Sequence, residues 1–82
     1  MPDDALSTIE NTIRGLIRAE LGDAELGLAS DIRFEELGLS SIKLLRMIAK
    51  LEKTYDVELD DDAIAHAETL GELAALIARQ RT

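Results

Sequence analysis

The sequence predicts an all-α fold: an antiparallel four-helix bundle with three main helices, one short third helix and a long loop between the first two helices. Apolar residues recur at the 3.6-residue spacing of amphipathic helices in three stretches of the 82-residue chain. Residue types that favour helix dominate, and the only aromatic residues, which favour strands, are Phe34 and Tyr55. A chain of this length is expected to form one domain, residues 1–82.

The first helix is expected to run from Asp4 to Leu21. Its apolar side chains recur along one face. They are Leu6, Ile9, Ile13, Leu16, Ile17 and Leu21. Arg14 and Arg18 lie off that face, and Gly22 suits the C-terminal cap of the helix.

Residues 22–40 have no helical period and are punctuated by Gly, Ser and Asp, so they are expected to form a loop. A loop this long in a compact domain usually has a function or packing of its own. Its apolar side chains are expected to hold it against the core, with a short helical turn near residues 34–37. These side chains are Leu26, Leu28, Ile32, Phe34 and Leu37.

The second helix is expected to run from Ser41 to Tyr55, with either Ser40 or Ser41 capping its N-terminus. The residues expected on its core-facing side are Leu44, Leu45, Met47, Ile48, Leu51 and Tyr55. On the opposite side lies a set of cationic side chains, the basic row, which consists of Lys43, Arg46, Lys50 and Lys53.

Two further helices complete the predicted bundle. Acidic residues 60–62 suit the start of a short helix that reaches about His66, because the helix macrodipole is positive at its N-terminus. Thr69 and Glu72 have the spacing of a capping box, which predicts the start of the last helix. The apolar face of that helix consists of Leu70, Leu73, Leu76 and Ile77.

Composition excludes several classes of function. The formal net charge of -8 opposes binding to nucleic acids and to anionic membranes, and it favours partners with a basic surface. The chain has no Cys, so disulfides, thiolate metal sites and a Cys nucleophile are excluded. No apolar run approaches the roughly 18 residues that a membrane span needs. The first four residues include two aspartates, whereas a secretory signal begins with basic residues. A cytoplasmic protein is expected.

The segment from Phe34 to Ile42 is the most informative part of the chain for function. It is a loop that delivers Ser41 to the first turn of an amphipathic helix, and Gly38 permits a positive φ angle there. The unpaired N–H groups and the positive dipole end of a helix favour a phosphate. The residues alone also allow a simpler interpretation, in which Ser40 and Ser41 are only helix caps.

The run Leu37-Gly38-Leu39-Ser40-Ser41-Ile42, with the apolar periodicity of the helix that follows, resembles the modification site of acyl and peptidyl carrier proteins, usually Leu-Gly-x-Asp-Ser-Leu. The resemblance extends over nearly the whole order of helices. It implies that Ser41 accepts 4′-phosphopantetheine from coenzyme A through a phosphopantetheinyl transferase. The arm then carries acyl or aminoacyl groups as thioesters, and it supplies the thiol that this chain lacks. The resemblance further implies a non-catalytic carrier, expected to be a monomer, that serves loading and synthase enzymes.

Three departures from the family pattern shape the prediction. Ser40 replaces the usual Asp, Ile42 replaces the usual Leu, and the second helix is basic where carriers of fatty acid synthesis are acidic. We therefore expect partners with acidic or apolar docking surfaces and a specialised pathway, such as polyketide or nonribosomal peptide assembly. The residues expected to dock are Ile42, Lys43, Arg46, Ala49 and Lys53. The absence of a Gly-Gly-x-Ser site favours acyl over aminoacyl cargo.

Alternatives remain open at this point. The chain is expected to be a discrete carrier, although an excised domain would have the same sequence features. An unmodified helical interaction module would use the basic row to bind an acidic partner. A small hydrolase would need Ser41 and His66, but no Gly-x-Ser-x-Gly elbow is present. Glu58 and residues 60–62 lack the spacing of an EF-hand loop, so helix capping is preferred to metal binding there. Glu35 and Glu36 are candidates for contacts with the transferase.

Overall fold

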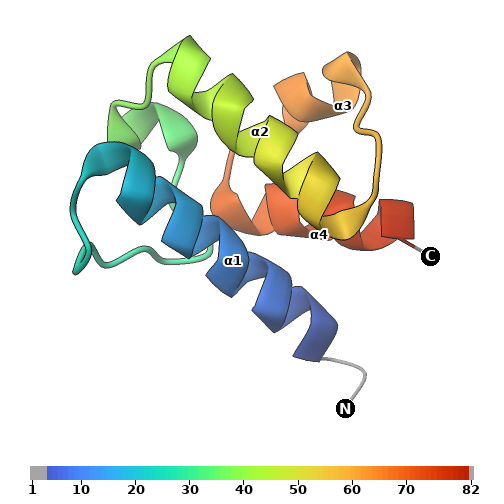
Figure 1. The fold of residues 1–82 in the computed structure, drawn as a ribbon, viewed down its shortest axis with the longest axis horizontal. Helices are drawn as coiled ribbons and strands as arrows, with labels where there is room; N and C mark the ends of the chain where they lie inside the picture. The colour runs from blue at the N-terminus through green and yellow to red at the C-terminus, as the bar shows by residue number, and fades with distance from the viewer. Residues whose placement is uncertain (1–3, 82) are drawn as a thin grey trace.

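The computed structural model describes residues 4–81, which form the predicted all-α bundle (Figure 1). In chain order the elements are α1 (Asp4–Leu21), the 3-10 turn η1 (Phe34–Leu37), α2 (Ser41–Tyr55), α3 (Asp61–His66) and α4 (Leu70–Arg81). The expected bounds of the first two helices and of the turn are confirmed, and α3 begins one residue after its N-cap, Asp60. The acidic opening at residues 1–3 lies outside the described part of the chain.

The hydrophobic core lies where α1, α2 and α4 meet, with α1 packing chiefly against α4. Its buried side chains are Ile9, Ile13, Ile17, Leu28, Phe34, Met47, Ile48, Leu51, Leu59, Leu70, Leu73, Ala74, Leu76 and Ile77. The short helix α3 contributes no buried residue and packs against this core only through half-buried side chains. The three longer helices therefore provide most of the burial that stabilises the fold.

Two apolar residues are exposed where the sequence predicts burial. The prediction that Leu45 faces the core is wrong, because its side chain is 62% exposed. One residue turns an α-helix by about 100°, so Leu45 lies beyond the covered arc of α2 although Leu44 lies within it. Leu6 is 41% exposed, and in Figure 1 the first turns of α1 extend past α4.

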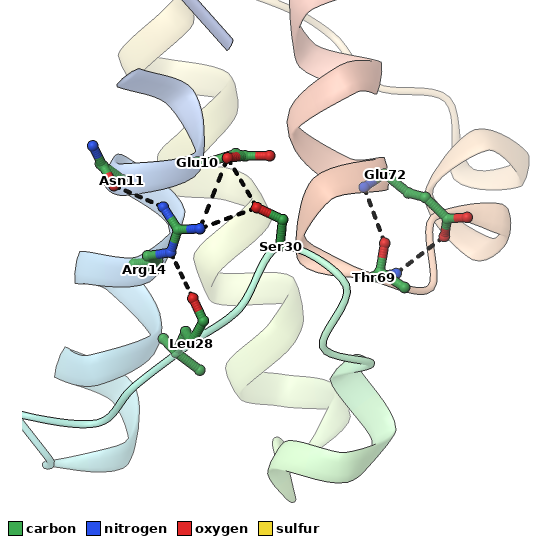
Figure 2. A network of polar contacts seen from close by, with 7 residues as sticks. All are labelled: Glu10, Asn11, Arg14, Leu28, Ser30, Thr69 and Glu72. Carbon is green, nitrogen blue, oxygen red and sulfur yellow. Dashed lines mark hydrogen bonds and ion pairs between the residues drawn. The ribbon is translucent and has the colours of Figure 1, made fainter. Parts of the chain in front are cut away.

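The first half of the long loop is held by two arginines of α1, Arg14 and Arg18, and Figure 2 shows the contacts of Arg14. Arg14 donates from Nε to the carbonyl of Leu28 at 2.8 Å and from Nη2 to the Ser30 hydroxyl at 3.1 Å. Arg18 Nε donates to the carbonyl of Leu26 at 2.9 Å. Backbone carbonyls that no secondary structure pairs thus receive charged donors, which orders the loop.

The second half of the loop pairs with the first turn of α4 and with the residue Glu68 just before it, whose carbonyl accepts from the Phe34 N–H at 3.0 Å. The Gly71 N–H donates to the Ser30 carbonyl at 2.7 Å, and the Leu70 N–H donates to the Ile32 carbonyl at 3.1 Å. A Cβ atom added to Gly71 would lie 3.0 Å from the Ser30 oxygen, so any larger residue would force the loop backbone to move by a few tenths of an ångström. Together with the α1 contacts, this pairing confirms that the loop is ordered, as its apolar residues predict.

The start of α4 confirms the predicted capping box, which is also drawn in Figure 2. The Glu72 N–H donates to Thr69 Oγ1 at 3.1 Å, and Glu72 Oε1 accepts from the Thr69 N–H at 3.1 Å. A hydrogen bond of 2.8 Å from the Tyr55 hydroxyl to Thr12 Oγ1 joins the C-terminal end of α2 to the middle of α1. Within residues 4–81, none of the helices has both the length and the apolar character needed to span a bilayer.

Candidate functional site at the start of helix α2

The two adjacent serines at the start of α2 have different roles. Ser40 is the N-cap: its Oγ accepts from the Lys43 N–H at 3.2 Å, and its carbonyl accepts from the Leu44 N–H at 2.9 Å. Ser41 is the first helical residue and is exposed. Its hydroxyl makes no hydrogen bond with any residue in the described range 4–81. The structure therefore assigns the cap to Ser40 and leaves the Ser41 hydroxyl available for reaction.

The turn η1 and the residue after it position Ser41. Phe34 is buried at the start of η1, while Leu37 and Leu39 pack half-buried against the core. Gly38 ends η1 with φ 69° and ψ 22°, the left-handed conformation that glycine adopts without strain. Gly38 thus adopts the positive φ that its glycine permits, and this conformation turns the chain from the anchored η1 into the N-cap of α2.

The electrostatic environment of Ser41 suits a phosphate ester. The first N–H groups of an α-helix have no intrahelical partner, and the Ser40 cap satisfies only that of Lys43. The N–H groups of Ser41 and Ile42 remain as donors at the positive end of the helix dipole. The site thus fits a phosphodiester attached to the first residue of α2.

Glu35 and Glu36 contact Arg33. The Glu36 carboxylate accepts from the Arg33 N–H at 3.3 Å, and Glu35 accepts from Arg33 Nε at 3.3 Å. Arg33 also forms an ion pair with Glu68 at 3.0 Å. The Glu35 hydrogen bond and charge, followed by the Glu68 charge, raise the pKa of Arg33. Both glutamates thus interact with the N-cap residue of η1, and Glu36 is part of its capping box. Their contact with the transferase stays a prediction.

Two open hollows flank α3. One of about 240 Å³ lies between η1, α2 and α3, one turn along α2 from Ser41, and its apolar lining includes Phe34, Leu44 and Ile64. The other, of about 300 Å³, lies between α3 and α4 and is lined by His66. His66 Nδ1 is 2.7 Å from the Asp62 carbonyl of its own helix. His66 is therefore not part of the hollow near Ser41, and no interaction joins these two residues within the described chain.

The outward face of α2 carries the predicted docking residues. Ile42 is 69% exposed, Ala49 and Lys53 are exposed, and Leu45 joins them against expectation. The basic row is confirmed as a surface feature, with Lys43 half-buried and the others exposed.

Glu20 of α1 was not anticipated as a partner of the basic row. Its side chain is only 7% exposed and forms ion pairs with Arg46 at 3.3 Å and with Lys50 at 3.7 Å. The one sequence feature that points to these ion pairs is the position of Glu20 beside the apolar face of the first helix. Among residues 4–81, no cluster of three or more His, Asp or Glu side chains is arranged to hold a metal ion.

Comparison with known proteins identifies the family. The family model described as the phosphopantetheine attachment site matches residues 11–77. The chain belongs to the acyl carrier protein family.

Several curated carriers are similar to this chain. It is 35% identical to a probable acyl carrier protein of Caulobacter vibrioides, over 88% of this chain and 93% of that protein. It is 35% identical to the anthracycline acyl carrier protein DpsG of Streptomyces peucetius, over 70% of this chain and 71% of that protein. It is 40% identical to the actinorhodin polyketide synthase acyl carrier protein of Streptomyces coelicolor, over 57% of this chain and 55% of that protein.

Family membership confirms the central predictions made from the sequence. This carrier has a phosphopantetheine-dependent role in biosynthesis, and 4′-phosphopantetheine is its cofactor. Members of the family are carriers that interact with synthase and modifying enzymes.

Proposed function

We propose that Ser41 is the residue of this carrier that bears the 4′-phosphopantetheine arm. The observation that carries the proposal is the division of labour at the start of α2, where the Ser40 hydroxyl caps the helix and the Ser41 hydroxyl has no partner among residues 4–81. Ser41 also occupies the Ser position of the family motif, within the matched segment.

The surroundings of Ser41 support a phosphodiester there. When bound, the arm supplies the thiol on which an acyl group is held as a thioester, and the chain itself has no Cys. The N–H groups of the first turn stabilise the phosphate charge, and the anchored η1 fixes its position. The carrier then needs no catalytic residue of its own, and it is a substrate for the transferase, for a loading enzyme and for synthase enzymes.

The cargo is an acyl chain, and the pathway is of the polyketide type. Relatives of this chain are named for anthracycline, actinorhodin and oxytetracycline carriers, which supports this choice over peptide assembly. The Gly-Leu-Ser-Ser sequence before and at the site, without the Gly-Gly pair of many peptidyl carriers, supports the same choice. Residues 1–82 act as one carrier domain, which is cytoplasmic and monomeric.

Intact mass spectrometry tests the attachment site. The purified chain is incubated with coenzyme A and a promiscuous phosphopantetheinyl transferase, beside Ser41→Ala and Ser40→Ala variants. We expect the mass of one phosphopantetheine to be added to the parent chain and to Ser40→Ala, and none to Ser41→Ala. Addition to Ser41→Ala would move the site, with Ser40 the first suspect. No addition with several transferases would instead favour an unmodified interaction module.

A further inference from the structure

Two parallel rows of side chains run along the outward face of α2. An apolar row, Ile42, Leu45 and Ala49, follows the spacing i, i+3, i+7. The basic row follows the same spacing one residue later, with a fourth member at i+10. Because an α-helix has 3.6 residues per turn, each row runs nearly parallel to the helix axis and the two rows are adjacent.

The apolar row is exposed next to the attachment serine. Ile42 is 69% and Leu45 is 62% exposed, and burying them would contribute favourable free energy that the isolated chain does not gain. The row begins at the residue after Ser41, so an enzyme that reaches the arm also meets this face.

The ion pairs of Glu20 show on which side of the apolar row the basic row lies. The Glu20 carboxylate lies between Arg46 and Lys50, so the basic row is on the side of α2 that faces α1. Lys43 and Lys53, at the two ends of the row, form no ion pair within residues 4–81. The one acidic residue of α2, Glu52, accepts a hydrogen bond from the Leu59 N–H at 2.9 Å.

We infer that α2 docks a partner protein whose contact surface is apolar and bears carboxylates along one edge, the edge that meets the α1 side of α2. The inference rests on the proposed attachment at Ser41, which brings partner enzymes to this face. Charge complementarity supports it, because the rest of a chain with 17 acidic residues repels an acidic partner while the basic row attracts it. The one-sided row also gives the docked partner a single orientation along the helix.

Two synthetic amphipathic helical peptides test this inference as defined stand-ins for the partner. Both have the same leucine face, which is edged by Glu in one peptide and by Lys in the other. Each is titrated into the ¹⁵N-labelled chain. We expect the Glu-edged peptide to shift amide signals of residues 42–53 and to bind at least about fivefold more tightly, with a preference that weakens as salt screens exposed charges.

Matched variants separate the contributions of charge and of apolar contact. Lys43→Gln with Lys53→Gln should weaken the Glu-edged peptide by about threefold to tenfold. Ala24→Glu with Gln80→Glu changes the net charge equally, at exposed sites outside α2, and should have little effect. Leu45→Ser should abolish binding, whereas Leu6→Ser, at the other exposed leucine, should not.

Equal affinity for the two peptides, or shifts outside α2, would overturn the inference. Self-association of the chain through α2 would overturn it as well, since the occupant would then be a second copy. The titration does not require the arm. Binding without modification by any transferase would therefore refute the proposed function alone, and modification without peptide preference would refute the docking inference alone.

Discussion

Replacing Gly71 by Ala should destabilise the fold, whereas the same change at Gly15 should stabilise it. A Cβ at residue 71 would lie 3.0 Å from the Ser30 carbonyl oxygen, which already accepts the Gly71 N–H at 2.7 Å. The loop cannot retreat cheaply, because Arg14 holds it from the other side. Overpacking costs about 1–3 kcal/mol, and the gain in helix propensity offsets at most about 1 kcal/mol. With a mid-range overpacking cost of about 2 kcal/mol, a net loss of about 1–2 kcal/mol is expected.

At Gly15 the added methyl group meets no atom within 4 Å, in the middle of α1. Gly15→Ala should therefore gain about 0.5–1 kcal/mol through reduced backbone entropy of the unfolded chain. Thermal unfolding followed by circular dichroism measures both changes, at roughly 4–8 °C per kcal/mol for a domain of this size. Gly71→Ala with stability equal to the parent would show that the loop yields, and would refute the view that α1 pins it. Combining Gly71→Ala with Arg14→Met should reduce the cost of Gly71→Ala if the reasoning is right.

Three further predictions can be tested by urea unfolding. Arg14→Met should lower the free energy of unfolding by about 2–3 kcal/mol, because a loop carbonyl loses a charged donor. Arg33→Met should lower it much less, since the partners of Arg33 are exposed carboxylates. Equal losses for the two variants would contradict this prediction. Glu20→Gln should cost roughly 1 kcal/mol by removing two ion pairs, and an unchanged midpoint would show that the pairs contribute nothing to stability. Ser40→Ala should lower the free energy of unfolding by about 1 kcal/mol, because it removes the helix cap. Ser41→Ala should change it by less than about 0.5 kcal/mol. A larger loss for Ser41→Ala than for Ser40→Ala would mean that the Ser41 hydroxyl is the cap.

Most of the fold follows from local patterns in the sequence. The periodicity of apolar residues predicts the bounds of α1 and α2, and the Thr69–Glu72 spacing predicts the start of α4. These features depend on neighbours three or four residues apart, which the sequence displays directly. Leu45 shows the limit of such reasoning, since the width of the covered arc on α2 depends on where α1 and α4 pack.

For the candidate site, the sequence proposes a residue but does not predict the contacts around it. The motif around Ser41 indicates the attachment position, yet only the structure shows which serine caps the helix. The ion pairs of Glu20 join residues 26 and more positions apart, and local spacing carries no information about such pairs. The hydrogen bonds from Arg14 and Arg18 to loop carbonyls could not be predicted from the sequence either, because every residue has a backbone carbonyl and the sequence does not indicate which one accepts.

The division between Ser40 and Ser41 has a consequence for how the carrier is marked for modification. The two side chains are chemically identical neighbours, so residue type cannot tell a transferase which oxygen to use. The point at which the helix begins makes the distinction, because it ties one hydroxyl to the backbone and exposes the other. A shift of the helix start by one residue would exchange the two serines without any change in composition. With Ser41 as the proposed attachment residue, the position of the arm is determined by the residue at which α2 begins, and Gly38 and the buried Phe34, which lie just before that residue, help to determine it.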